Sequence, residues 1–217
     1  MSDTPAIDLV ETLPPTWRLA LAYAPAQVRQ RWLTFMALDM RLAGVVRPVQ
    51  MGERDPIMAQ LRLAWWRDRL KEPSAQWPKG EPLLAALADW QDGHGVLVAL
   101  VDGWEAMLAE APLDMGAMGQ LADGRVTACV AIASGDAVER MARGWALGEM
   151  LDQPAHPDET AALQAAAQAH DWRRGGLPRA MRPLAVLHGL AARHVKGKKT
   201  DTIGALIASM RLGLFGY

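Results

Sequence analysis

Apolar residues recur at three- and four-residue steps along almost the whole chain, which is the spacing of an amphipathic helix. Runs of Val, Ile and Thr that alternate with polar residues are missing, so the pattern predicts an all-α protein. The helices that this pattern predicts cover residues 15–40, 56–72, 82–91, 96–110, 114–134, 136–152, 158–172, 178–196 and 201–214.

Prolines and capping residues indicate where several of these helices begin or break. Pro25 is expected to divide the first helix into a short and a long piece. Asp55 followed by Pro56 is a favourable helix start, and Asp136 is a candidate N-cap. The connections are mostly shorter than ten residues, which favours one bundle of antiparallel neighbours over residues 15–217, preceded by a flexible segment at 1–14.

Composition places the chain among globular proteins of a reducing compartment. Of its 217 residues 51% are apolar and 22% are charged, and the net charge is −1. Cys129 is the single cysteine, so no internal disulfide can form. The acidic start MSDTPAIDLVET does not resemble a signal peptide, and no apolar run has the length of a membrane span. We therefore expect a cytoplasmic protein, with attachment to a membrane surface left open.

Positive charge is concentrated between residues 171 and 200, where eight basic residues accompany the single acid Asp171. Such a segment can meet phosphates or anionic headgroups, or it can be a solvated surface paired with acids elsewhere. Stacking aromatics do not alternate with the basic residues, which argues against nucleic acid. The candidate anion or membrane patch consists of Arg173, Arg174, Arg179, Arg182, Lys196, Lys198 and Lys199.

The stretch LRLAWWRDRL at 61–70 alternates apolar and cationic side chains around a whole helix. This pattern predicts a helix buried on most sides, with its arginines paired to acids of neighbouring helices. It fits a central packing helix, and it also fits a helix that lines a cavity for an anion with an apolar chain.

Common catalytic and metal-binding motifs are missing from the sequence. No two histidines have a metal-binding helical spacing, and no phosphate-binding glycine loop is present. Glu149 and Asp152 are three residues apart and could share a cation, although such pairs are more often solvated helix ends.

Two stretches resemble the squalene/phytoene synthase family. These are RLALAYAPAQVRQRWLTFMALDMRLAGVV at 18–46 and PIMAQLRLAWWRDRL at 56–70. GQLADGRVTACVAIA at 119–133, ARGWALGEML at 142–151 and LPRAMRPLAVLHGLAARHV at 177–195 are similar to later family helices, in the same order. The residues that match the family motifs and that the resemblance makes candidates for a substrate cavity are Arg62, Trp65, Trp66, Arg67 and Thr127.

The resemblance implies the isoprenoid synthase fold and, in active members, head-to-head joining of two prenyl diphosphates with magnesium held by two acidic motifs. This chain departs from both motifs. No acid follows Asp39 before Glu53, and ALGEMLDQ at 146–153 stands where the second motif is expected. The chain is also shortened after Gln153. We therefore expect a divergent member, a pseudoenzyme that lacks the standard reaction.

Three functions remain open at this point. The first is binding of an isoprenoid, a lipid or a protein partner without a cofactor, as in relatives linked to respiratory-complex assembly. The second is an active prenyl diphosphate transferase that uses magnesium in a rearranged site. The third is a structural protein whose cavity has filled in. The candidate magnesium ligands are Asp39, Asp68, Glu149 and Asp152.

Overall fold

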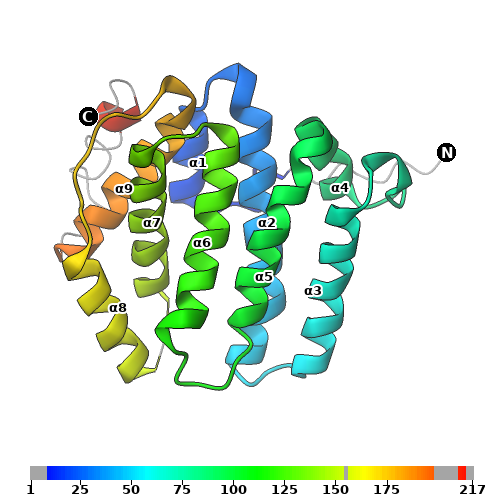
Figure 1. Cartoon of the computed structure of the whole chain (residues 1–217), viewed down its shortest axis with the longest axis horizontal. Helices are drawn as coiled ribbons and strands as arrows, with labels where there is room; N and C mark the ends of the chain where they lie inside the picture. The colour runs from blue at the N-terminus through cyan, green and yellow to red at the C-terminus, as the bar shows by residue number, and fades with distance from the viewer. Residues whose placement is uncertain (1–8, 154–155, 198–209, 214–217) are drawn as a thin grey trace.

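A computed structural model describes residues 9–153, 156–197 and 210–213 of the chain, and this part is helical with no strand (Figure 1). The prediction of an all-α fold is confirmed. None of the helices described has the length and apolarity that crossing a bilayer requires. The elements are α1 (Pro15–Ala22), α2 (Ala26–Gln50), α3 (Pro56–Lys71), α4 (Pro82–Leu87), α5 (Val98–Ala106), α6 (Met115–Ile132), α7 (Asp136–Leu151), α8 (Pro157–Ala169) and α9 (Arg182–Val195), with 3₁₀ turns at Ser74–Gln76, Ala88–Leu97 and Arg179–Met181.

Local sequence signals account for several helix starts. The Asp55 carboxylate accepts a hydrogen bond from the N–H of Ile57, and Pro56 occupies the first turn of α3, as predicted. The Asp114 carboxylate caps α6 in the same way. The prediction for α7 was wrong by one residue: Gly135 is the N-cap, at a φ of 144° that favours glycine, and Asp136 is the first helical residue.

The first predicted helix does break at Pro25, but its second half is longer than expected. α2 continues through Pro48 to Gln50, so the connection to α3 is only residues 51–55. At 1.5 Å per residue, the 25 residues of α2 extend about 37 Å, and the helix runs the height of the bundle in Figure 1. The helix predicted to reach residue 110 ends at Ala106. The last predicted helix, 201–214, lies outside the described residues except for 210–213, which are helical.

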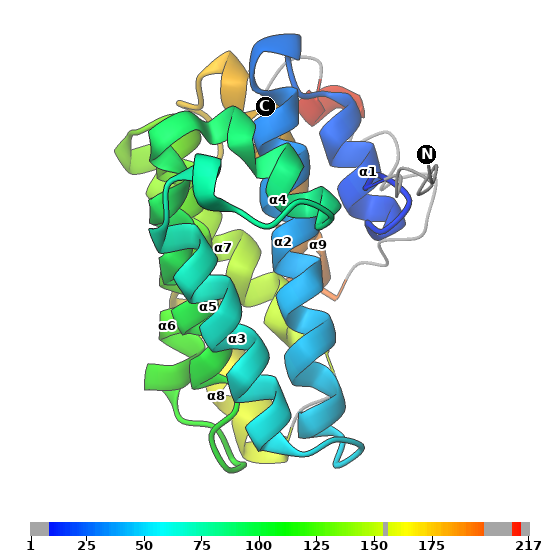
Figure 2. The same ribbon diagram turned by 90° about the vertical axis from the view of Figure 1, so that its right-hand side faces the viewer.

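The core is formed around α2 and α7 by large aromatic side chains. Trp145 of α7 meets Trp17 of α1 and Phe35 of α2 edge to face, at centroid distances of 5.3 and 6.0 Å. Leu13 is also buried in this core. Part of the segment at 1–14, which was expected to be flexible, is therefore packed against the helices. In Figure 2, α5 and α6 lie on one side of the molecule and α1 on the other, with α2 beside α1.

α3 lies at an edge of the bundle, against α2 and α5 (Figures 1 and 2). One face of the helix, which includes Leu63, Trp66 and Leu70, is buried. The opposite face exposes apolar side chains. The prediction that this helix is buried on most sides is therefore wrong, and the exposed apolar residues are Ile57, Met58, Leu61 and Trp65.

Candidate functional site

A cavity of about 690 Å³, here called the main cavity, lies within the described part of the chain. This volume is typical of sites that hold a small molecule. Its wall is mostly apolar and comes from α2, from α5 and the loop after it, and from α6, α7 and α8. The lining residues are Arg47, Val49, Gln50, Met51, Pro56, Trp104, Met107, Leu108, Ala109, Glu110, Ala111, Leu113, Met118, Leu121, Arg125, Glu149, Met150, Gln153, His156, Glu159 and Leu163.

The main cavity opens at the end of the bundle where α2 meets α3 and α5 meets α6. Met51, Pro56, Glu110 and His156 line the cavity and are also exposed to solvent. Met51 is 62% exposed, although it is apolar. The α2–α3 and α5–α6 connections lie at the lower end of the bundle in Figure 1, so the mouth of the main cavity is at this end.

The inner end of the main cavity holds a buried ion pair. Arg125 of α6 donates from Nε to Oδ2 of Asp39 on α2 over 2.8 Å, and both side chains are almost fully buried. The indole N–H of Trp104 donates to the other oxygen, Oδ1, over 2.6 Å. The guanidinium lies 5.8 Å from the ring of Trp104 and 5.4 Å from that of Trp145. Asp39 therefore has partners for both oxygens, whereas Arg125 has donors to spare.

Arg47 supplies a second cation to the same wall. Its guanidinium lies 5.9 Å from the Trp104 ring, and no hydrogen bond or ion pair joins it to the described residues. Burial lowers the pKa of Arg47 first, and the charge of Arg125 lowers it further, whereas Asp39 and Glu149 act in the opposite direction. Even with this shift, an arginine stays protonated at neutral pH.

Free N–H donors therefore face the main cavity from two arginines. Nη1 of Arg125 is buried and has no hydrogen-bond partner within the described structure. A buried donor without a partner costs free energy, so a ligand that supplies an acceptor there is favoured. Carboxylate and phosphate oxygens match a guanidinium best. The arrangement suits a ligand whose anionic group reaches Arg125 and whose remainder is apolar.

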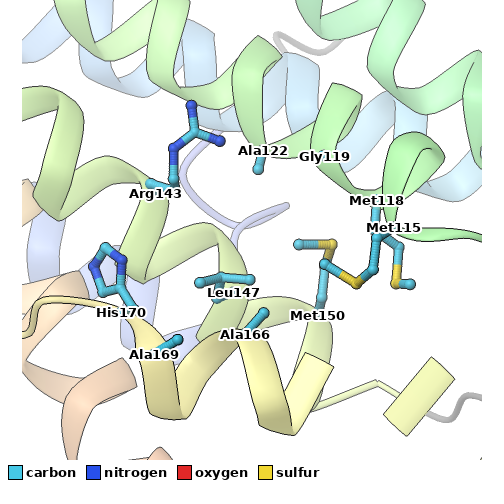
Figure 3. Close-up of a pocket in the computed structure, with 10 residues that line it drawn as sticks. All are labelled: Met115, Met118, Gly119, Ala122, Arg143, Leu147, Met150, Ala166, Ala169 and His170. Atoms are coloured by element: carbon cyan, nitrogen blue, oxygen red, sulfur yellow. The ribbon is translucent and has the colours of Figure 1, made fainter. Parts of the chain in front are cut away.

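A smaller hollow of about 240 Å³, here called the side pocket, lies between α6, α7 and α8 (Figure 3). Met115, Met118 and Met150 gather at one end of it, and Arg143 and His170 lie at the other. Small apolar residues form the rest of the wall: Gly119, Ala122, Leu147, Ala166 and Ala169.

The family-motif candidates do not gather at the main cavity. Among the described residues, those that line it include none of Arg62, Trp65, Trp66, Arg67 and Thr127. Trp66 is 4% exposed and belongs to the core, whereas Trp65 is 38% exposed and packs on its neighbour at 5.0 Å. Arg67 pairs with Asp102 and Glu105 of α5. These contacts give the α3 motif a packing role.

The four candidate magnesium ligands do not form a cluster. No group of three or more His, Cys, Asp or Glu side chains with metal-binding geometry occurs in the described ranges. The Glu149 carboxylate accepts from the indole N–H of Trp17 over 3.0 Å. Asp152 lies 3.7 Å from His194, and Asp68 is exposed on α3. The charges of Asp39 and Glu149 both raise the pKa of Arg47, so the Arg47 guanidinium lies near two of the four candidate carboxylates.

The basic segment is spread over two elements and a loop. Arg173 pairs with Asp171, with Nη2 2.7 Å from the nearer carboxylate oxygen. Arg179 and Lys196 are exposed, Arg182 starts α9, and Arg174 lies near Arg193 and Arg211. Partial burial and these two arginines lower the pKa of Arg174. Lys198 and Lys199 lie outside the described residues.

Sequence reasoning missed the residues that give the main cavity its charge. Arg125 is the single basic residue of GQLADGRVTACVAIA, where most of the other residues are small or apolar, and such an arginine is itself a signal of a buried partner. Arg47 and Trp104 carried no comparable signal, because Arg47 lies between the helices predicted at 15–40 and 56–72, and nothing near Trp104 in the sequence indicates a cavity.

Two histidines outside the main cavity, one buried and one half-buried, lie close together. His188 of α9 is fully buried, and neither of its ring nitrogens has a hydrogen-bond partner among the described residues. Its ring centroid is 6.5 Å from that of His170. Burial above all, and then the neighbouring His170, Arg174 and Arg140, lower the pKa of His188 to about 3. Burial also lowers the pKa of His170. Both rings are therefore neutral at pH 7.

No family model matches the chain, and neither a curated protein nor a solved structure is found to be similar to it.

Proposed function

We propose that this protein binds an amphipathic ligand, an isoprenoid or lipid chain with one anionic group, in the main cavity. The observation that carries the proposal is the pair of arginines with free donors, Arg47 and Arg125, in an otherwise largely apolar cavity of about 690 Å³. An anionic group would satisfy these donors, and the apolar wall would shield the chain from water.

The motif resemblance to squalene/phytoene synthases supports a ligand of this class, and an isoprenoid synthase type of helical fold forms part of the proposal. The positions of the carboxylates favour binding over prenyl transfer. Asp39 is hydrogen-bonded to Arg125 and Trp104, and Glu149 to Trp17, so both have protein partners in place of a metal ion. A diphosphate without magnesium has little help to ionise.

Binding can be measured by isothermal titration calorimetry with farnesyl phosphate and palmitate, and with farnesol as the uncharged comparison. We expect both anions to bind saturably and farnesol to bind at least about tenfold more weakly, because a hydrogen bond to a charged group contributes about 1.5–3 kcal/mol. Arg47→Gln should weaken binding of the anions about tenfold or more and leave farnesol unchanged. The Arg47 side chain makes no hydrogen bond to the described residues, so this variant is expected to fold.

The matched control is Arg18→Gln, which removes an exposed arginine of α1 and should leave all affinities unchanged. Anions that fail to bind, or that bind equally well to Arg47→Gln, would overturn the proposal. Incubation with farnesyl diphosphate and magnesium tests the transferase alternative: release of pyrophosphate that is lost in Glu149→Ala and Asp152→Ala would favour catalysis instead.

A further inference from the structure

The outer face of α3 carries a stripe of exposed apolar side chains that no described helix covers. Ile57, Met58 and Leu61 are each more than half exposed, and Trp65 is 38% exposed. The helix lies on the side of the molecule that faces the viewer in Figure 2. Met58, Leu61 and Trp65 follow one another at steps of three and four residues, which is the spacing with which one helix packs along another. The stripe therefore has the pattern of a helix–helix contact.

The two ends of this stripe carry opposite charges. Arg54 lies just before α3 and Asp68 lies near its C-terminal end, and both are exposed. No ion pair joins either side chain to the described residues. Each is seven residues from Leu61, which on a helix is two turns and about 10 Å. The stripe thus has a cation at one end, an anion at the other, and Leu61 midway between them.

Such a stripe is complementary to a copy of itself that runs in the opposite direction. When Leu61 of each copy lies at a twofold axis, a residue that precedes Leu61 faces the residue that follows it by the same number of positions in the other copy. Arg54 then faces Asp68 of the second copy, and Ile57 faces Trp65. Symmetry makes each of these contacts twice. A parallel pair would instead bring like charges together.

The charges around the stripe favour a protein surface over an anionic lipid surface. Between Glu53 and Glu72 the sequence has five basic and four acidic residues. A helix that binds anionic lipid typically has an excess of Lys and Arg on its polar face. In addition, Arg67 and Arg69 are already paired with acids of the protein. A surface of mixed charge, such as α3 itself provides, matches this balance better.

We propose that two copies of this chain associate through the outer faces of α3, packed antiparallel about Leu61. Trp65 of each copy covers Ile57 of the other, and Arg54 pairs with Asp68 at both ends. One pair of helices gives a small contact, so the dimer forms at micromolar concentrations. Below them the chain is single and Trp65 is exposed, so the stability of Trp65 variants is measured there. The inference does not depend on the ligand of the main cavity.

Sedimentation velocity of the wild-type protein between about 1 and 200 µM tests the association. The average mass should rise with concentration from one chain toward two. Leu61→Glu brings two carboxylates together at the centre of the contact and should remain a single chain throughout. The matched control is Met115→Glu, which changes an exposed apolar residue at the start of α6 and should behave as the wild type. A wild-type protein that stays single, or a dimer that persists in Leu61→Glu, would overturn the inference.

Exchange of the two charges tests the antiparallel direction. Arg54→Glu and Asp68→Arg each place like charges opposite one another at both ends of the contact. Each should weaken the dimer about fivefold or more, since two exposed ion pairs are lost and like charges replace them. The double variant with both changes restores opposite charges and should regain the wild-type affinity. Both side chains are exposed and unpaired in the described chain, so the variants are expected to fold. A double variant weaker than either single one would contradict this arrangement.

Thiol cross-linking locates the twofold axis. In Leu61→Cys the two introduced thiols lie together, so oxidation with diamide should give a covalent dimer. In Arg54→Cys they lie about 20 Å apart and should not be joined. The native Cys129 is buried and serves as an internal control. Equal cross-linking of the two variants would contradict an axis at Leu61. A protein that stays single and sediments with phosphatidylcholine vesicles would assign the stripe to lipid and overturn the inference.

Discussion

Asp39 and Arg125 form an ion pair in which one member has all its acceptors engaged and the other does not. The Asp39 carboxylate accepts hydrogen bonds from Arg125 and Trp104, whereas Nη1 of Arg125 has no hydrogen-bond partner in the described structure. Removing one member of such a buried pair leaves the other charge uncompensated, which costs far more than breaking a pair at the surface.

Asp39→Asn should therefore lower the free energy of unfolding by about 3–5 kcal/mol, measured by urea denaturation. Asp123→Asn is the matched control, because its pair with Arg143 is exposed on both sides, and it should cost less than about 1 kcal/mol. Equal effects of the two substitutions would mean that the Arg125 charge is compensated by another route.

The neighbours Trp65 and Trp66 are expected to differ sharply in their contribution to stability. Trp66→Ala opens a large hole in the core and should cost about 3–5 kcal/mol, whereas Trp65→Ala removes a partly exposed ring and should cost at most about 1 kcal/mol. Thermal or urea unfolding of the two variants gives the comparison. A larger loss for Trp65→Ala would indicate that the outer face of α3 is covered in solution.

At the scale of elements, α5 and α6 approach closely because glycines lie where they cross. A Cβ added to Gly124 would lie 2.6 Å from the carbonyl oxygen of Ala99, and one added to Gly103 would lie 2.7 Å from Cα of Leu121. Backbone atoms cannot move aside without shifting a helix. These two glycines thus set the separation of the helices that carry Trp104 and Arg125.

Gly124→Ala should separate α5 from α6 and lower stability by about 1–3 kcal/mol. Gly44→Ala is the matched control, since a Cβ there meets nothing within 4 Å on α2 and alanine favours the helix by about 0.5–1 kcal/mol. The two substitutions should therefore change the urea midpoint in opposite directions. A gain in stability from both would show that the contact between α5 and α6 is looser than the structure indicates.

Much of the element order could be predicted from the sequence, because local signals decide it. The break at Pro25 and the cap at Asp55 depend on neighbours along the chain. The position of α3 could not be predicted in this way. Its mixture of apolar and cationic residues fits both burial and an edge, and only the absence of a helix over Leu61 and Trp65 in the described bundle decides between them. The end of α2 could not be predicted from Pro48 either, because the helix continues past this proline to Gln50.

At the scale of the whole molecule, His188 and His170 link stability to pH. An unfolded histidine takes up a proton near pH 6.5, whereas His188 in the folded protein resists protonation down to about pH 3, and the pKa of His170 is also lowered. Arg140, Arg143 and Arg174 disfavour protonation and Asp171 favours it. The unfolded state therefore binds more protons below pH 6.5, and stability falls as the pH decreases.

Each such histidine should contribute a slope of up to about 1.4 kcal/mol per pH unit below pH 6.5. Urea unfolding between pH 7 and pH 5 measures this slope above the range in which most carboxylates titrate. His188→Leu should make the slope shallower. An unchanged slope in His188→Leu would show that His188 is protonated in the folded state.

The candidate site could be predicted only in part. The sequence indicated the helix that contains Thr127, two residues after the cavity-lining Arg125. A cavity, however, depends on distances between helices that are far apart along the chain. Asp39 and Arg125 are 86 residues apart, and no local pattern reports their contact. The lone Arg125 in an apolar helix was the one usable signal.

The depth of Arg125 has a consequence for rates. An anionic group that enters at Met51 must travel inward past apolar side chains and lose most of its water before it reaches the guanidinium. The ligand crosses this barrier both on entry and on departure. The association and the dissociation rate constants should therefore both be low for a small molecule. A bound ligand would then exchange rarely. Slow exchange suits a protein that binds a molecule better than a protein that converts it rapidly.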